Sequence, residues 1–200
     1  KDPDIILFGT VKALEKIYGI EDTIKAFIKL FHKLQLEGKT ELASKLRYHI
    51  YGKGEQKNHL QRLIDDEGMS NIIKLCGYVN HKELPNILNQ FTVFCCTSLS
   101  ESFGVAAVEA MACGIPVVVS DAEGFAEVVE NNVTGLVVPK HNIDAIADGM
   151  YQLLMNREMR DSFGAAGIQR AKKLYDWNQN VQNMLEIYKK VSEDKQRQKE

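Results

Sequence analysis

The sequence is poor in the features that mark membrane spans, nucleic-acid binding and metal sites. It has no apolar run of the length needed to cross a bilayer. Its formal net charge of −2 over 200 residues offers no basic surface for nucleic acid, and we expect no such partner. The five histidines and four cysteines form no Cys-x-x-Cys or His-x-x-x-His pattern, so we expect no metal site. The cysteines lie in apolar surroundings and are expected to be reduced, as in a cytoplasmic protein: Cys76, Cys95, Cys96 and Cys113.

The composition is that of an ordinary globular domain, and the chain alternates between two kinds of pattern. Short β-rich runs alternate with segments whose apolar residues recur at helical spacing. This alternation predicts an α/β, Rossmann-like three-layer domain with a mostly parallel sheet and helices on both faces. We expect one domain over residues 1–192 and a charged tail over 193–200 that frays. The predicted strands are 4–8 (ending at Gly9), 45–51, 72–75, 92–97, 116–120 and 136–138, and the predicted helices are 22–36, 56–66, 84–90, 124–130, 142–154, 158–174 and 177–191.

The most informative stretch is residues 98–116, which carries two carboxylates and no other charge. Glu101 precedes the expected helix start, and Glu109 is expected about two turns inside that helix. The first-turn N–H groups near Gly104 and Val105 have no partner within a helix, so they form an anion site at the positive end of the helix dipole. A ligand with hydroxyls and a phosphate, such as a nucleotide sugar, would fit between the two carboxylates.

The same pattern also has a purely structural interpretation. Glu101 can serve as a capping or first-turn acid, and Glu109 as a solvated helix residue. Spacing alone does not decide between the two interpretations.

A wider set of motifs resembles retaining glycosyltransferases of the GT-B fold, glycosyltransferase family 4 (glycosyl transferases group 1). The Glu-x-Phe-Gly segment and the second Glu are followed by Ala-Cys-Gly-Ile-Pro-Val-Val at 112–118. The sequences Gly-Phe-Ala-Glu-Val-Val at 124–129 and Thr-Gly-Leu-Val-Val-Pro at 134–139 follow in the order expected of the family. The resemblance also includes Phe-Gly-Thr-Val-Lys at 8–12 and Tyr-Gly-Ile at 18–20. It implies the C-terminal, donor-binding half of a GT-B enzyme, without the N-terminal acceptor half.

The resemblance also implies roles for individual residues. Glu101 would be the catalytic carboxylate that holds the donor-sugar hydroxyls, and Glu109 would accept hydrogen bonds from the ribose. Lys12 or Lys16 would neutralise the departing diphosphate. The remaining donor-binding residues would act largely through the main chain: Gly9, Gly77, Tyr78 and Val79 along the strand ends, and Ser102, Phe103, Gly104 and Val105 at the helix start.

The loop after the first strand departs from the family pattern. A basic residue is usual where this chain has Thr10, and a lysine is usual where it has Ile17. Lys12 and Lys16 are each slightly displaced from those positions. Gly-Lys-Gly at 52–54 is a tight strand-to-helix turn that lies near the nucleotide in the family.

These features predict a donor-binding domain that uses a UDP- or GDP-linked sugar and needs no cofactor. The enzyme would transfer the sugar to a glycan or lipid-linked acceptor, in bacterial surface polysaccharide synthesis such as that of capsule or lipopolysaccharide. We expect a cytoplasmic protein, with peripheral association at the inner membrane face through the missing half; this fragment alone would be inactive. The alternatives are a GT-B epimerase or phosphorylase domain and a non-catalytic α/β nucleotide-binding module.

Overall fold

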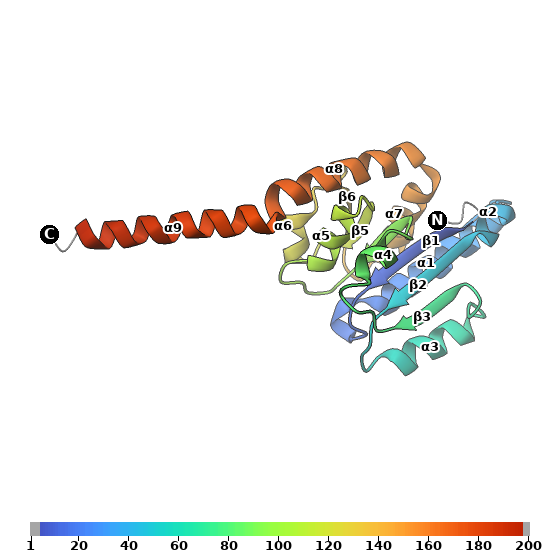
Figure 1. The fold of residues 1–200 in the computed structure, drawn as a ribbon. Helices are drawn as coiled ribbons and strands as arrows, with labels where there is room; N and C mark the ends of the chain where they lie inside the picture. The colour runs from blue at the N-terminus through green and yellow to red at the C-terminus, as the bar shows by residue number, and fades with distance from the viewer. Residues whose placement is uncertain (1–4, 198–200) are drawn as a thin grey trace.

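The computed structural model describes residues 5–197 and consists of one parallel sheet between two layers of helices, with one long helix that projects from the body (Figure 1). The six strands are β1 (Ile6–Val11), β2 (Leu46–Tyr51), β3 (Ile73–Gly77), β4 (Val93–Cys96), β5 (Val117–Ser120) and β6 (Gly135–Val138). The helices are α1 (Ile20–Leu36), α2 (Thr40–Ser44), α3 (Lys57–Asp66), α4 (Leu84–Leu88), α5 (Val105–Ala112), α6 (Glu123–Val128), α7 (Ile143–Met155), α8 (Arg157–Tyr175) and α9 (Trp177–Arg197). No helix in this part of the chain is long and apolar enough to cross a membrane.

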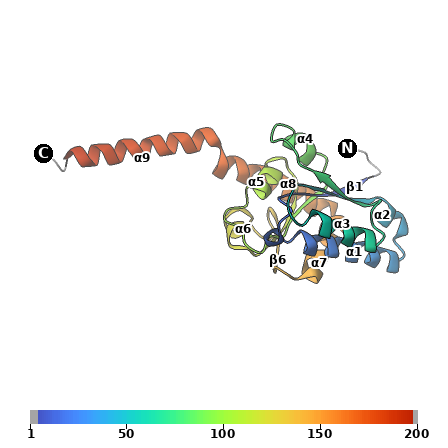
Figure 2. The same ribbon diagram turned by 90° about the horizontal axis from the view of Figure 1, so that it is seen from below.

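The strand order is β3-β2-β1-β4-β5-β6, and all neighbouring strands are parallel. Figure 2 shows α1, α3 and α7 on one side of the sheet and α4 and α5 on the other. The chain runs outward from β1 in one direction and from β4 in the other, so the loops after these two adjacent strands diverge. A crevice opens at such a switch point, outside the carboxyl ends of the strands. The three-layer α/β prediction is confirmed.

Each face of the sheet buries its own apolar cluster, because successive strand residues point to opposite faces. Phe8 packs with Phe27 and Tyr48 beneath α1 and α7: the ring centroids are 5.5 Å apart for Phe8 and Phe27, and 5.1 Å apart for Phe27 and Tyr48. Phe91 and Phe94 belong to the opposite cluster, beneath α4 and α5. Together the two clusters account for the burial of the sheet.

The structure corrects the predicted boundaries of the first strand and the last helix. β1 does not end before Gly9 but runs on to Val11, so Gly9 lies inside the strand. A Cβ added at Gly9 would lie 2.2 Å from the ring of Phe91, which explains the glycine by packing. Helix α9 continues to Arg197, six residues beyond the predicted helix end at 191; the fraying expected from residue 193 stays a prediction, and 198–200 lie outside the described residues.

Helix α9 carries an apolar stripe that is exposed along its length. Trp177 is 78% exposed, and Val181, Met184, Tyr188 and Val191 follow it at alternating steps of four, three, four and three residues. That spacing places their side chains on one face of the helix. Figure 1 shows α9 leading away from the body.

Candidate donor-binding site

The loop from β4 to α5 and the loop after β1 meet at the switch point of the sheet. There Lys12 Nζ lies 2.6 Å from Glu101 Oε2, and the two side chains are only 16% and 8% exposed. The hydroxyl of buried Ser98 donates a hydrogen bond to the same carboxylate oxygen at 3.2 Å. The ammonium also lies 4.4 Å from the ring centroid of Tyr18. A buried charge needs partners of this kind, and here the sequence-predicted lysine and carboxylate supply them to one another.

Two predicted loop residues explain how α5 begins beside this ion pair. Gly104 adopts φ +98°, a conformation that side chains rarely adopt, and it precedes the first helical residue, Val105. Within residues 5–197, no protein acceptor meets the main-chain N–H groups of Val105 and Ala106, whereas that of Ala107 donates to Gly104 O. The first turn of α5 contains no acidic side chain. Two main-chain donors at the positive end of α5 are therefore left without a partner among the described residues.

Glu109 lies on the second turn of α5, closer to the helix start than the sequence suggested. Its side chain is 27% exposed, and one carboxylate oxygen lies 3.7 Å from His81 Nδ1. Burial raises the pKa of Glu109 above its ordinary value, and the charge of His81 opposes that rise only in part. The imidazole comes from the segment between β3 and α4, the same segment that carries Tyr78 and Val79.

A hollow of about 290 Å³ opens between the β1, β2 and β3 strand ends. Lys12 lies on its wall, so the hollow adjoins the Lys12–Glu101 pair, and Tyr78 and Val79 form another wall. Tyr78 is 70% exposed, and Lys53 Nζ lies 5.1 Å from its ring centroid. The full lining is Val11, Lys12, Ala13, Tyr51, Gly52, Lys53, Tyr78 and Val79. These walls offer an aromatic face, aliphatic surface and positive charge.

Close backbone approaches shape this hollow. A Cβ at Gly52 would lie 1.9 Å from the carbonyl oxygen of Lys12, so only glycine allows the β1 and β2 loops to come together. Gly77 ends β3 with φ +80°, and its carbonyl accepts a hydrogen bond from the Gly52 N–H at 2.7 Å. Of the two strand-end glycines predicted for the site, Gly77 is at the edge of the sheet and Gly9 is not.

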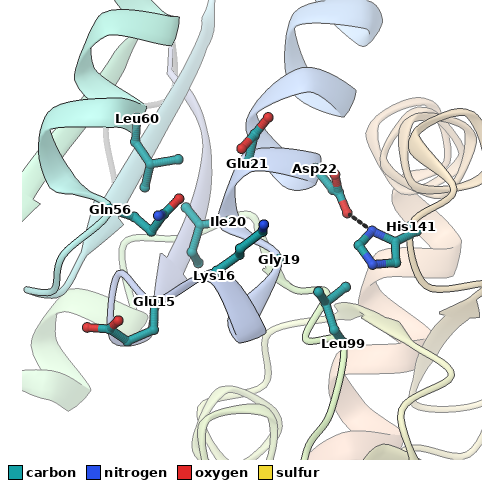
Figure 3. Close-up of a pocket in the computed structure, with 10 residues that line it drawn as sticks. All are labelled: Glu15, Lys16, Gly19, Ile20, Glu21, Asp22, Gln56, Leu60, Leu99 and His141. Carbon is teal, nitrogen blue, oxygen red and sulfur yellow. Dashed lines mark hydrogen bonds and ion pairs between the residues drawn. The ribbon is translucent and has the colours of Figure 1, made fainter.

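The second candidate lysine, Lys16, lies elsewhere. It lines a different hollow of about 180 Å³, with Glu15, Asp22 and His141, at the start of α1 (Figure 3). There the Asp22 carboxylate pairs with His141 Nδ1 at 3.0 Å. The hollows of Lys12 and Lys16 share no lining residue. The structure thus groups Lys12, and not Lys16, with Glu101.

The departure at Thr10 also has a structural explanation. The Thr10 side chain is fully buried, and its hydroxyl lies 2.6 Å from the Tyr48 hydroxyl and donates to the carbonyl of Cys95 at 2.7 Å. A basic side chain could not occupy that apolar position without losing its solvation. Lys12, two residues later, supplies the positive charge at the end of the strand.

The sequence of this chain matches the model of a known protein family. The model described as glycosyl transferases group 1 matches residues 1–170. The chain belongs to this family. Phosphatidyl-myo-inositol mannosyltransferase of Mycobacterium leprae is 30% identical over 158 residues, which are 78% of this chain and 41% of that protein.

Solved structures of GT-B glycosyltransferases share the fold. A mutant of Staphylococcus aureus TarM, in complex with fondaparinux, alpha-GlcNAc-glycerol and UDP, aligns with a TM-score of 0.79 and 24% identity, over 92% of this chain and 36% of that one. Anabaena HepE, in complex with UDP and glucose, aligns with a TM-score of 0.80 and 20% identity, over 93% of this chain and 48% of that one. The chain thus spans less than half the length of the proteins it matches here.

Sequence reasoning missed several residues of this group 1 glycosyltransferase site. Tyr18 and Ser98 contact the Lys12–Glu101 pair, and His81 contacts Glu109. Tyr18 and Ser98 lie within the stretches 18–20 and 98–116, but their spacing gave no indication of these contacts, and His81 lies in no motif. Lys53 was visible only as part of a glycine-flanked turn.

Proposed function

We propose that this chain is the donor-binding half of a retaining, family 4 glycosyltransferase that uses a nucleoside diphosphate sugar. The observation that carries the proposal is the Lys12–Glu101 pair: Lys12 lines the hollow walled by Tyr78, and Glu101 lies in the loop that leads to the unpartnered N–H groups at the start of α5. A donor substrate has a base, a diphosphate and a sugar in that order. We propose that the hollow, Lys12 with the α5 start, and Glu101 would bind these three parts in turn.

Each part of the donor has a chemical counterpart. The base would lie in the hollow against Tyr78 and Val79, and the ribose hydroxyls would donate to Glu109. The diphosphate would take the charge of Lys12 and the N–H groups of the α5 start. Glu101 would accept hydrogen bonds from the sugar hydroxyls. As the glycosidic bond breaks, negative charge grows on the diphosphate, so fixed positive groups there stabilise the transition state more than the bound substrate.

Retention of configuration is part of the proposal and concerns the roles of the two carboxylates. Retaining hydrolases use two closely spaced carboxyl groups, one of them as the nucleophile. Here Glu109 is assigned to the ribose, so we do not assign it the nucleophile's role. The leaving phosphate would instead assist the acceptor hydroxyl on the same face of the sugar. The anomeric configuration of the product, read by NMR in the full-length protein, tests this part directly.

The acceptor would bind to the other half of the full protein. We propose a glycan or lipid-linked acceptor, a class represented by the phosphatidyl-myo-inositol mannosyltransferase of Mycobacterium leprae. The exposed stripe of α9, which begins at Trp177, would pack against that half. Closure of the two halves would exclude water from the donor and limit its hydrolysis.

Calorimetry with UDP, GDP and ADP tests the binding claim. We expect saturable binding of one of them by the wild-type chain, weakened by about 1.5–3 kcal/mol in Lys12→Met or Glu109→Gln, because each removes a charge-assisted contact. Lys74→Met, an exposed lysine on β3, is the matched control and should bind as the wild type does. Lys16→Met should have a far smaller effect than Lys12→Met. Absence of binding to all three nucleotides would contradict the proposed function, and it would equally contradict the alternative of a nucleotide-binding module.

A further inference from the structure

The loop that carries Glu101 and Phe103 is held by contacts from α6 and α8 in addition to the Lys12–Glu101 ion pair. It connects β4 to α5 through Gly104, which adopts φ +98° and, because it lacks a Cβ, restrains the loop conformation less than another residue would. Its main chain rests on α6: the Gly124 N–H donates to Glu101 O at 2.9 Å. A Cβ at Gly124 would lie 2.5 Å from Phe103 N, so the two backbones touch with no side chain between them.

The side chain of Phe103 is held by a residue from the far end of the domain. Its ring meets that of Tyr175 edge to face, with centroids 5.5 Å apart and planes at 85°. The Tyr175 hydroxyl donates to the carbonyl of Glu127 on α6 at 3.3 Å. Arg170, five residues earlier on α8, donates to the Glu127 and Val128 carbonyls at 2.9 Å and 2.8 Å.

Residues at the end of α8 thus donate hydrogen bonds to the last turn of α6, while the β4–α5 loop contacts the first turn of α6. Tyr175 touches both, because its ring contacts Phe103 and its hydroxyl contacts Glu127. Phe103 is 38% exposed and directly precedes Gly104. Within residues 5–197, Tyr175 provides the only aromatic contact of the Phe103 ring, and this contact restrains the direction of the Phe103 side chain.

We infer that Tyr175 is a positioning residue for the donor loop: by holding Phe103 it fixes the main-chain N–H groups at the α5 start. The inference rests on the proposed function, in which these N–H groups meet the distal phosphate and the sugar. Tyr175 itself would not touch the donor. Its effect should therefore fall on ligands that reach the loop and spare ligands that end before it.

Three variants separate this role from general stability. Tyr175→Leu removes the ring, Tyr175→Phe keeps the ring and removes the hydroxyl, and Leu174→Ala changes an exposed neighbour on the same helix end. Order parameters from ¹⁵N relaxation for residues 102–105 report the rigidity of the loop, with residues of β1 as the internal reference. Calorimetry compares the nucleoside diphosphate that binds the wild type, among UDP, GDP and ADP, with its own monophosphate.

In Tyr175→Leu we expect lower order parameters over 102–105 with β1 unchanged. Affinity for the diphosphate should fall about two- to tenfold, the range given by one aromatic pair, while that for the monophosphate stays within about twofold. Tyr175→Phe should restore both readouts, and Leu174→Ala should match the wild type.

Two results would overturn the inference. One is a loop in Tyr175→Leu that is as rigid as in the wild type. The other is an equal loss for diphosphate and monophosphate, which would indicate general damage to the fold. If the wild type binds none of the three nucleotides, the proposed function fails, while the relaxation data still decide whether Tyr175 holds the loop.

Discussion

The two carboxylates of the site lie on the same helix–loop unit but in different electrostatic surroundings. Glu101 is almost fully buried and is matched at 2.6 Å by Lys12. Within residues 5–197, the polar contact of the partly buried Glu109 carboxylate is the 3.7 Å approach of His81 Nδ1, and burial raises the pKa of Glu109. The Glu101 carboxylate is thus already paired before any ligand binds, whereas the Glu109 carboxylate has no close ion pair among the described residues. Hydroxyl donors from a ligand would supply what Glu109 lacks.

The largest expected effect comes from removing Lys12, the ion-pair partner of Glu101. Lys12→Met leaves Glu101 buried and unpaired, so we expect the free energy of unfolding to fall by about 3–5 kcal/mol in urea denaturation. The double variant Lys12→Met/Glu101→Gln should recover part of that loss, because no charge is then left alone. A loss below about 1 kcal/mol in the single variant would mean that water solvates the pair.

The next effect compares two glycines of positive φ, Gly104 at the start of α5 and Gly77 at the end of β3. A Cβ at Gly104 meets both an unfavourable φ of +98° and the Phe125 ring at 2.8 Å, so Gly104→Ala should cost about 2–4 kcal/mol. Gly77, with φ +80°, has open space around the added Cβ, so Gly77→Ala should cost only about 1–2 kcal/mol. Equal losses in thermal or urea unfolding would show that packing against Phe125 is unimportant.

The smallest effect concerns how the unfolding free energy depends on pH through Glu109. Because the pKa of Glu109 is raised in the folded state, protonation favours folding. The contribution is complete below the ordinary glutamate pKa and is lost as pH rises through the higher, folded-state pKa. Glu109→Gln should therefore match the wild type in unfolding free energy at low pH and exceed it at pH 7. A variant less stable than the wild type at pH 7 would show that the ionised carboxylate has a stabilising partner in the fold.

The sequence predicted the layers of the fold better than it predicted the ends of its elements. Period-2 and helical patterns report burial, and burial determines the sheet and its helices. The end of β1 was misplaced because Gly9 looked like a turn residue, whereas it makes room for the Phe91 ring. The length of α9 was underestimated because charged residues after 192 lack the apolar pattern on which the prediction relied.

For the site, motif spacing identified the α5 start but not its partners. Nothing in the spacing of Lys12 and Lys16 favoured one over the other, since the choice depends on which side of the loop each faces. His81 and Tyr175 are remote in sequence from the groups they contact, so only the fold reveals them. Short motifs record local geometry, whereas these contacts arise from the packing of distant elements.

The exposed indole at the root of α9 gives the molecule a built-in optical reporter. Trp177 is the only tryptophan in the sequence and stands two residues beyond Tyr175. In the chain alone, its emission maximum should be red-shifted, as expected of a hydrated indole. A protein domain or partner that buries Trp177 would shift the emission maximum to shorter wavelength, so its docking can be followed by fluorescence without an attached dye.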